Sequence, residues 1–170
     1  MKNLKYFENI NEGKDTPNDK LKKYTIFSME KTIYYHGTGE ANKVKDALLN
    51  GSFIFHKSAG VENGIYLTPN KELASQYADI TNGNDKGVLE IPFKHKPNFK
   101  FYKNAGEHYD DERSFSHNPK EATLKYREYL LLNGYDGVTT GNDVFTLFKE
   151  KINLIDVNKI SISIKKFKTF

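Results

Sequence analysis

The sequence contains neither cysteine nor tryptophan, and nearly all of its basic residues are lysine. Without cysteine, the chain has no disulfide framework, no thiolate nucleophile and no zinc–thiolate site. The net charge of +4 favours acidic partners only weakly, and the absence of a dense basic run with arginine argues against a dedicated nucleic-acid-binding protein. No stretch is long and apolar enough to span a membrane, so we expect no membrane contact.

The residues that are present are typical of a globular domain. The chain has 170 residues and is 37% hydrophobic and 14% aromatic, which is sufficient for one hydrophobic core. Residues 1–30 are polar and lack the apolar segment of a classical signal peptide, so they are predicted to form an arm with a helix over 20–29. Residues 31–170 are predicted to form a single α+β domain, because short strands and three or four helices do not alternate regularly.

Local signals place the main helices and strands. In residues 40–49 the apolar positions fall on one face and Gly51 follows, and Asn118-Pro119 is a strong helix start before residues 120–132. A third helix is predicted to begin at Thr68-Pro69 and to end at Asn82-Gly83. Strands are predicted over 31–36, 52–56, 65–67, 87–93, 94–103, 143–148, 152–155 and 160–164, and residues 135–138 are predicted to enter another. A long polar loop is predicted over 104–117.

Two segments carry the residues with the greatest chemical interest. Tyr34-Tyr35-His36-Gly37-Thr38 is predicted to be a strand that breaks at the glycine before a helix, which places an imidazole and a hydroxyl beside exposed backbone. Such a corner suits a ligand that takes hydrogen bonds from both backbone and side chains, although a His-Gly turn without a ligand is the commoner case. Gly64-Ile65-Tyr66-Leu67-Thr68 is followed by the helix that carries Tyr77.

Two further segments have alternative interpretations. Lys94–Lys103 mixes lysine with aromatic residues, and we favour a strand with one apolar and one solvated face over a surface for single-stranded nucleic acid. The loop 104–117 holds histidines and acidic residues, including His108 and His117, but their spacing is not that of a known metal site. We therefore predict a solvated loop and no metal.

Together, the two segments resemble the ADP-ribosyltransferase superfamily, in the branch of diphtheria toxin and the poly-ADP-ribose polymerases. The resemblance rests on Tyr35-His36-Gly37-Thr38, on Gly64-Ile65-Tyr66-Leu67-Thr68 and on Tyr77, which follows Tyr66 at a spacing similar to that of the two nicotinamide-stacking tyrosines of the branch. Gly134-Tyr135-Asp136-Gly137-Val138 resembles a segment of many bacterial and phage members. The resemblance covers roughly residues 31–160 and implies two small, mostly antiparallel sheets that flank an NAD cleft.

The resemblance also implies roles for the motif residues. Tyr66 and Tyr77 would clamp the nicotinamide ring of NAD by stacking, although each tyrosine alone would more commonly be a core residue. The backbone of Gly37 would hold the carboxamide, since glycine allows close approach. His36 would bind the adenosine-side ribose, and Thr38 would assist.

The third signature residue, a glutamate at the start of the last active-site strand, is absent at the expected place. In relatives this carboxylate stabilises the positive charge that develops on the ribose. The corresponding segment begins Gly141-Asn142-Asp143-Val144, and a slip of one residue would reverse the faces of the strand. We assign the role to Asp143, with Glu150 as the second choice and a site without an acid as the third.

The expected function is an NAD-dependent mono-ADP-ribosyltransferase that transfers ADP-ribose to a macromolecular acceptor, protein or nucleic acid. The catalytic residues would be Asp143, His36 and Tyr66. The expected context is a toxin, effector or phage-encoded modifier that is cytoplasmic or is delivered into a host cytoplasm without a cleaved signal peptide. The alternatives are an NAD glycohydrolase, an inactive nucleotide- or partner-binding protein of the same fold, and a basic nucleic-acid-binding module that uses Lys94–Lys103 and the lysine-rich tail.

Overall fold

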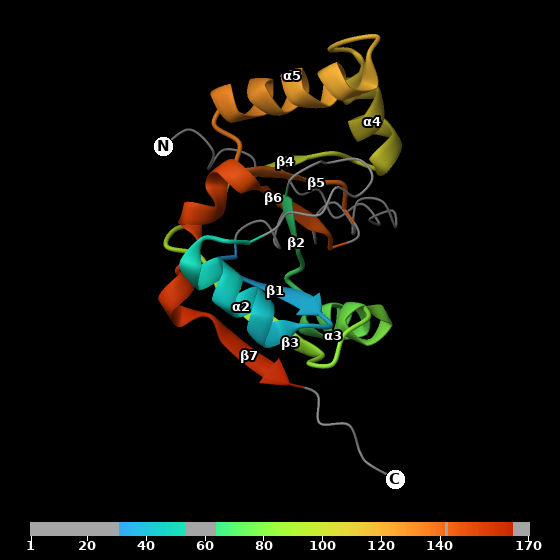
Figure 1. Cartoon of the computed structure of the whole chain (residues 1–170). Helices are drawn as coiled ribbons and strands as arrows, with labels where there is room; N and C mark the ends of the chain where they lie inside the picture. The colour runs from blue at the N-terminus through green and yellow to red at the C-terminus, as the bar shows by residue number, and fades with distance from the viewer. Residues whose placement is uncertain (1–30, 54–63, 142, 165–170) are drawn as a thin grey trace, which may run out of the picture.

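The computed structural model describes residues 31–53, 64–141 and 143–164, and these residues form seven strands, four α-helices and two 3₁₀ segments (Figure 1). The strands are β1 (Ile33–Thr38), β2 (Gly64–Leu67), β3 (Gly87–Pro92), β4 (Phe99–Phe101), β5 (Gly137–Thr139), β6 (Phe145–Phe148) and β7 (Ser161–Ile164). The helices are α2 (Ala41–Asn50), α3 (Lys71–Ile80), α4 (Ala105–Arg113) and α5 (Pro119–Leu132), and the 3₁₀ segments are η2 (Lys149–Leu154) and η3 (Val157–Lys159).

The strands form two small sheets. One has the order β1-β3-β7 and is antiparallel, and the other has the order β2-β6-β5-β4, in which only the β4–β5 pair is parallel. The two sheets are joined by a bridge in which Tyr35 N–H donates to Thr68 O at 2.7 Å and Thr68 N–H donates to Tyr35 O at 2.9 Å. The prediction of an α+β chain with mostly antiparallel sheets is confirmed.

The main core draws apolar side chains from both sheets. Tyr34 of β1 is fully buried and makes edge-to-face contacts with Phe93, Phe99 and Phe145, with ring centroids 5.6, 5.7 and 5.2 Å away. Such geometry is the preferred one for aromatic pairs. A second cluster lies under α5 and contains Tyr102, Tyr126, Leu130, Val138 and Phe148. Helices α4 and α5 lie beyond β4 at one end of the molecule, and α2 and α3 lie beside the β1-β3-β7 sheet (Figure 1).

The helix ends follow the local signals. Gly51 takes a left-handed φ of 72° after α2, and its N–H donates to Ala47 O. The Asn118 side chain accepts from the N–H groups of Lys120 and Glu121 at the start of α5, as predicted from the sequence. In α3 the capping residue is Asn70, not Thr68, and its side chain accepts from Leu73 N–H at 3.1 Å.

Several predicted elements are wrong. The segment 104–117 is not a loop throughout, because it contains α4, which Asn104 caps by accepting from Glu107 N–H at 2.9 Å. The predicted strand at 152–155 is largely the 3₁₀ segment η2, and β4 is only the middle of the strand predicted over 94–103. Strand β1 also continues through Gly37 to Thr38 instead of breaking at the glycine.

Some expectations concern residues that the structure does not describe. The polar arm 1–30 with its helix, the tail from 165, and residues 54–56 of the strand predicted over 52–56 lie outside the described residues, and Ser52 and Phe53 belong to no strand. In the part of the chain that is described, no helix has the length and apolar character needed to cross a membrane.

Candidate functional site

A cavity of about 330 Å³ opens where the two sheets meet. Three elements contribute to it: β1, the end of β2, and α3. Because the Tyr35–Thr68 bridge brings these elements together, residues that are far apart in the sequence share one wall. The lining residues are Tyr35, His36, Gly37, Tyr66, Leu67, Thr68, Tyr77, Thr81 and Val144.

His36 is held by a backbone contact across the cavity. Its Nδ1 lies 2.8 Å from the carbonyl oxygen of Tyr66. Since a carbonyl oxygen only accepts hydrogen bonds, Nδ1–H is the donor, and a neutral imidazole then has Nε2 as an acceptor. The contact fixes the ring orientation and ties β1 to β2.

Gly37 has two structural features of note. The N–H and C=O of Tyr35 point away from β3 and bond to Thr68. Backbone groups of alternate residues in a strand point to the same side, so the N–H and C=O of Gly37 also point away from β3, to the edge of the cavity. Among the described residues, no hydrogen bond joins these outward-facing groups of Gly37. On its other side Gly37 packs against α3, where an added Cβ would lie 1.8 Å from Ala74 O.

The two tyrosines predicted to clamp a ring both line the cavity. Tyr66 is 36% exposed and Tyr77 is 41% exposed. Neither is therefore a buried core residue, which was the alternative explanation for each. An aromatic ring at 36–41% exposure beside a cavity offers apolar surface to a ligand that the protein core does not use.

Thr38 does not line the cavity. Its Oγ1 accepts from Glu40 N–H at 3.2 Å, so the hydroxyl supports the turn between β1 and α2. Thr81, by contrast, lines the cavity and was not singled out in the sequence. It follows Tyr77 by four residues, and its N–H donates to Tyr77 O at 3.2 Å. Its i, i+4 spacing from Tyr77 places the two residues on the same side of a helix, and this spacing is the sequence signal that could have identified Thr81.

Among the described residues that line the cavity, none is acidic. Val144 occupies the position next to β6 on this wall, and Asp143, the residue assigned as the acid, is not a lining residue. Glu150 lies in η2, where its carboxylate is 3.6 Å from Arg127 Nε of α5. The structure thus brings together His36, Gly37, Tyr66 and Tyr77, but not Asp143 or Glu150.

Asp143 sits in a turn with an unusual backbone. Its φ is 58°, and Gly141 two residues earlier has a φ of 80°. Aspartate is one of the few residues that adopt this left-handed conformation readily. Partial burial raises the pKa of the Asp143 carboxyl, and the positive charge of Lys31 opposes that shift.

The segments with alternative interpretations have structural roles. Phe99 is buried in the core, and Lys100 Nζ lies 5.7 and 5.6 Å from the ring centroids of Tyr102 and Tyr135. Within the described residues, no group of three or more histidine or acidic side chains is placed to hold a metal ion. His108 is buried between the rings of Tyr102 and Tyr126.

Comparisons with family models, with curated proteins and with solved structures found no match to this chain. The family resemblance therefore rests on the motif residues, and the function has to be argued from the cavity.

Proposed function

We propose that this protein is an NAD-dependent mono-ADP-ribosyltransferase that cleaves the nicotinamide–ribose bond and transfers ADP-ribose to a macromolecular acceptor. One observation carries the proposal. Four of the residues singled out from the sequence come from three different elements and line the same cavity, namely His36, Gly37, Tyr66 and Tyr77. Its volume of about 330 Å³ lies within the range of small-molecule sites.

The cavity suits the nicotinamide end of NAD in shape and in hydrogen bonding. The ring is flat, and the exposed faces of Tyr66 and Tyr77 offer stacking surface. A carboxamide has one acceptor and two donors, which match the N–H and C=O that Gly37 directs to the cavity edge. In this arrangement His36, oriented by its contact with Tyr66 O, binds a ribose hydroxyl.

The reaction breaks the bond between ribose C1′ and the nicotinamide nitrogen. The electron pair leaves with the nitrogen, so nicotinamide departs neutral and positive charge develops on the ribose. The acceptor then forms the new bond to C1′ and loses a proton. A carboxylate near the ribose would stabilise the developing charge, and we assign that role to Asp143, which directly precedes the lining residue Val144.

A second candidate function is nucleotide binding without transfer. The observation that favours it is the position of Val144, since the described residues that line the cavity include no carboxylate. A cavity of this kind would hold the ring but would not stabilise charge on the ribose. Binding and turnover therefore have to be measured separately.

Calorimetric titration with NAD tests the binding part of the proposal. Tyr66→Ala should weaken NAD binding by about 1–3 kcal/mol, because stacking and apolar burial are lost. Tyr66→Phe keeps the ring and is the matched control, so it should retain most of the affinity. Equal NAD affinity in wild type and Tyr66→Ala would contradict the assignment of the cavity.

Incubation with labelled NAD and a cell lysate tests the transfer part. Mass spectrometry should find released nicotinamide and an acceptor that carries ADP-ribose. Nicotinamide release without a modified acceptor would identify a glycohydrolase, and NAD binding without nicotinamide release would favour the second candidate.

A further inference from the structure

The backbone of β1 has an open edge. Only one of its sides pairs with a strand along its full length, in the order β1-β3-β7. Thr32 O accepts from Phe93 N–H at 2.8 Å, so Thr32 faces β3, whereas Tyr35 faces Thr68. Because backbone groups alternate along a strand, Ile33, Tyr35 and Gly37 all direct their N–H and C=O groups to the side away from β3.

The Tyr35–Thr68 bridge divides this edge into two parts. Gly37 lies on one side of the bridge, at the candidate cavity, and Ile33 lies on the other side. Within residues 31–53, 64–141 and 143–164, no hydrogen bond joins the outward-facing N–H or C=O of Ile33. Ile33 is also 42% exposed, so the edge is accessible to a partner.

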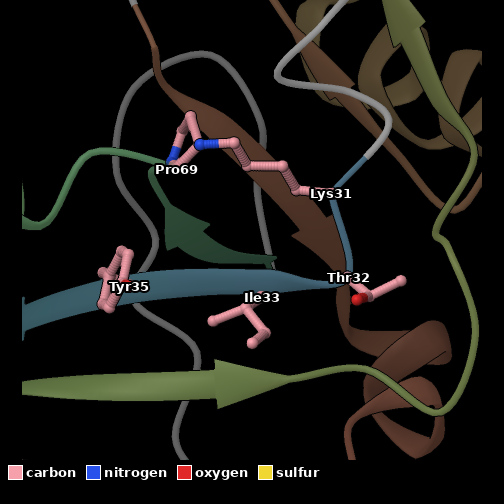
Figure 2. Close-up of a pocket in the computed structure, with 5 residues that line it drawn as sticks. All are labelled: Lys31, Thr32, Ile33, Tyr35 and Pro69. Atoms are coloured by element: carbon pink, nitrogen blue, oxygen red, sulfur yellow. The ribbon is translucent and has the colours of Figure 1, made fainter.

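A recess of about 380 Å³ lies at the Ile33 part of the edge. Its walls are Lys31, Thr32, Ile33, Tyr35 and Pro69. Figure 2 shows the Lys31 side chain extending from the chain before β1 towards Pro69, with Ile33 and Tyr35 along the strand. Tyr35 lines this recess and the candidate cavity, so a molecule in the recess would lie directly beside a ligand in the cavity.

We propose that this recess is the docking site for the acceptor, which binds as an extended segment of a protein that pairs with the open edge of β1 at Ile33. The identity of the partner as an acceptor rests on the proposed function. An exposed edge strand is a known platform for an added peptide strand, since backbone groups supply the hydrogen bonds. Because Tyr35 lines both the recess and the cavity, a segment bound in the recess would lie next to the site of the proposed transfer reaction.

The chemistry of the recess favours a peptide over a nucleic acid. The repeating N–H and C=O groups of a peptide match the edge at Ile33, and a nucleic-acid backbone has no equivalent pair.

Among the described residues that line the recess, Lys31 is the one that carries a charge. A lysine at an edge strand discourages pairing with a second copy of the same chain. The same ammonium group attracts a carboxylate of a docking peptide, although Asp143 offsets part of its charge. We therefore expect peptides that bind here to carry an acidic residue.

A displayed library of linear eight-residue peptides, screened against the full chain without NAD, tests the site. Enriched peptides should bind wild type and Ile33→Ala with similar affinity, because alanine keeps the N–H. Ile33→Pro removes that N–H, which faces away from the β3 ladder, and places a ring at the edge. Binding to Ile33→Pro should fall about ten-fold or more, the scale of one hydrogen bond with added steric exclusion.

A second measurement covers the case in which Ile33→Pro does not fold. Hydrogen exchange at the Ile33 amide of wild type, detected by NMR, should slow when an enriched peptide saturates the chain. Equal peptide binding by Ile33→Ala and folded Ile33→Pro, unchanged exchange at Ile33, or failure to enrich any peptide would each overturn the proposal. A dimer that Ile33→Pro abolishes would also overturn it, because a second copy would then occupy the edge.

The experiments can contradict the docking site and the proposed function independently of each other. Peptide binding without any NAD binding would contradict the proposed function but not the peptide site. NAD binding and turnover without an edge-dependent peptide would contradict the docking site alone.

Discussion

Gly37→Ala distinguishes two reasons for a glycine in this position. If the glycine serves only to let a ligand approach, the alanine variant should fold normally and lose ligand affinity. The structure gives a different reason, because the new Cβ would lie 1.8 Å from Ala74 O, 2.8 Å from Ala74 C and 2.9 Å from Ala78 N. All three atoms belong to the backbone of α3, so no side chain can rotate aside.

The magnitude follows from the nature of this contact. Overpacking by one methyl group costs typically 1–3 kcal/mol, and more when the neighbours cannot move. Since Gly37 meets helix backbone, we expect a loss of about 3 kcal/mol or more in the free energy of unfolding. For a chain of this length, that loss lowers Tm by roughly 6–12 °C. The relief of the clash would move α3 and with it Tyr77, so NAD binding should fall in the fraction that still folds.

Chemical denaturation of wild type, Gly37→Ala and Gly106→Ala measures this effect. Gly106 lies in α4, where the one described atom that an added Cβ would approach is Asn104 Oδ1, at 3.1 Å, the end of a side chain that can shift by a few tenths of an ångström. Alanine is a better helix former than glycine, so Gly106→Ala should be close to neutral or slightly stabilising. A Gly37→Ala variant as stable as wild type would refute the packing of α3 on β1, and with it the wall of the cavity that carries Tyr77.

Two further predictions concern acidic and titratable groups. Under the proposed function, Asp143→Asn should keep NAD affinity and lose about 100-fold in turnover, the scale of one electrostatic stabiliser. Asparagine tolerates the left-handed backbone of this turn, so the variant changes the charge alone. Glu150→Gln is the control, and a loss of turnover in that variant alone would assign the acid to Glu150. Burial lowers the pKa of His108 below its ordinary value of 6.5, with Asp111 opposing. The unfolded chain then binds more protons, so stability should decrease as pH falls below 6.5, and His108→Phe should flatten that part of the stability profile in pH-dependent denaturation.

Elements with local signals could be predicted from the sequence, and elements held by distant contacts could not. The start of α5 is encoded by Asn118 and Pro119, and the end of α2 by Gly51, all within one turn of the helix concerned. Helix α4 has a local start signal in Asn104, which accepts from Glu107 N–H, but it has no apolar face that a sequence pattern would reveal. It packs on the rest of the chain through His108, whose ring lies edge-to-face on Tyr102 and Tyr126.

Four of the six predicted site residues line the candidate cavity, and Thr38 and Asp143 do not. The geometry that brings the four together could not be predicted from the sequence. His36 and Tyr66 stand thirty positions apart, and their contact through Nδ1 and the carbonyl oxygen depends on the bridge between the two sheets. The sequence suggested a ligand role for the missing side chain of Gly37. The structure shows that the same absence is needed for close packing on α3.

The position of the acid depends on a register that a single sequence does not encode. Tyr66 pairs with Thr146 and Leu67 with Phe145, and one further step places Val144 opposite Thr68, on the face that lines the cavity. Side chains alternate along a strand, so the residue before Val144 would point to the other face if the strand continued. It does not continue, because Asp143 takes a φ of 58°. The direction of this carboxylate is therefore set by the turn and not by the sheet. A variant that changes only the charge of Asp143, and leaves the turn intact, is the correct probe of its part in the reaction.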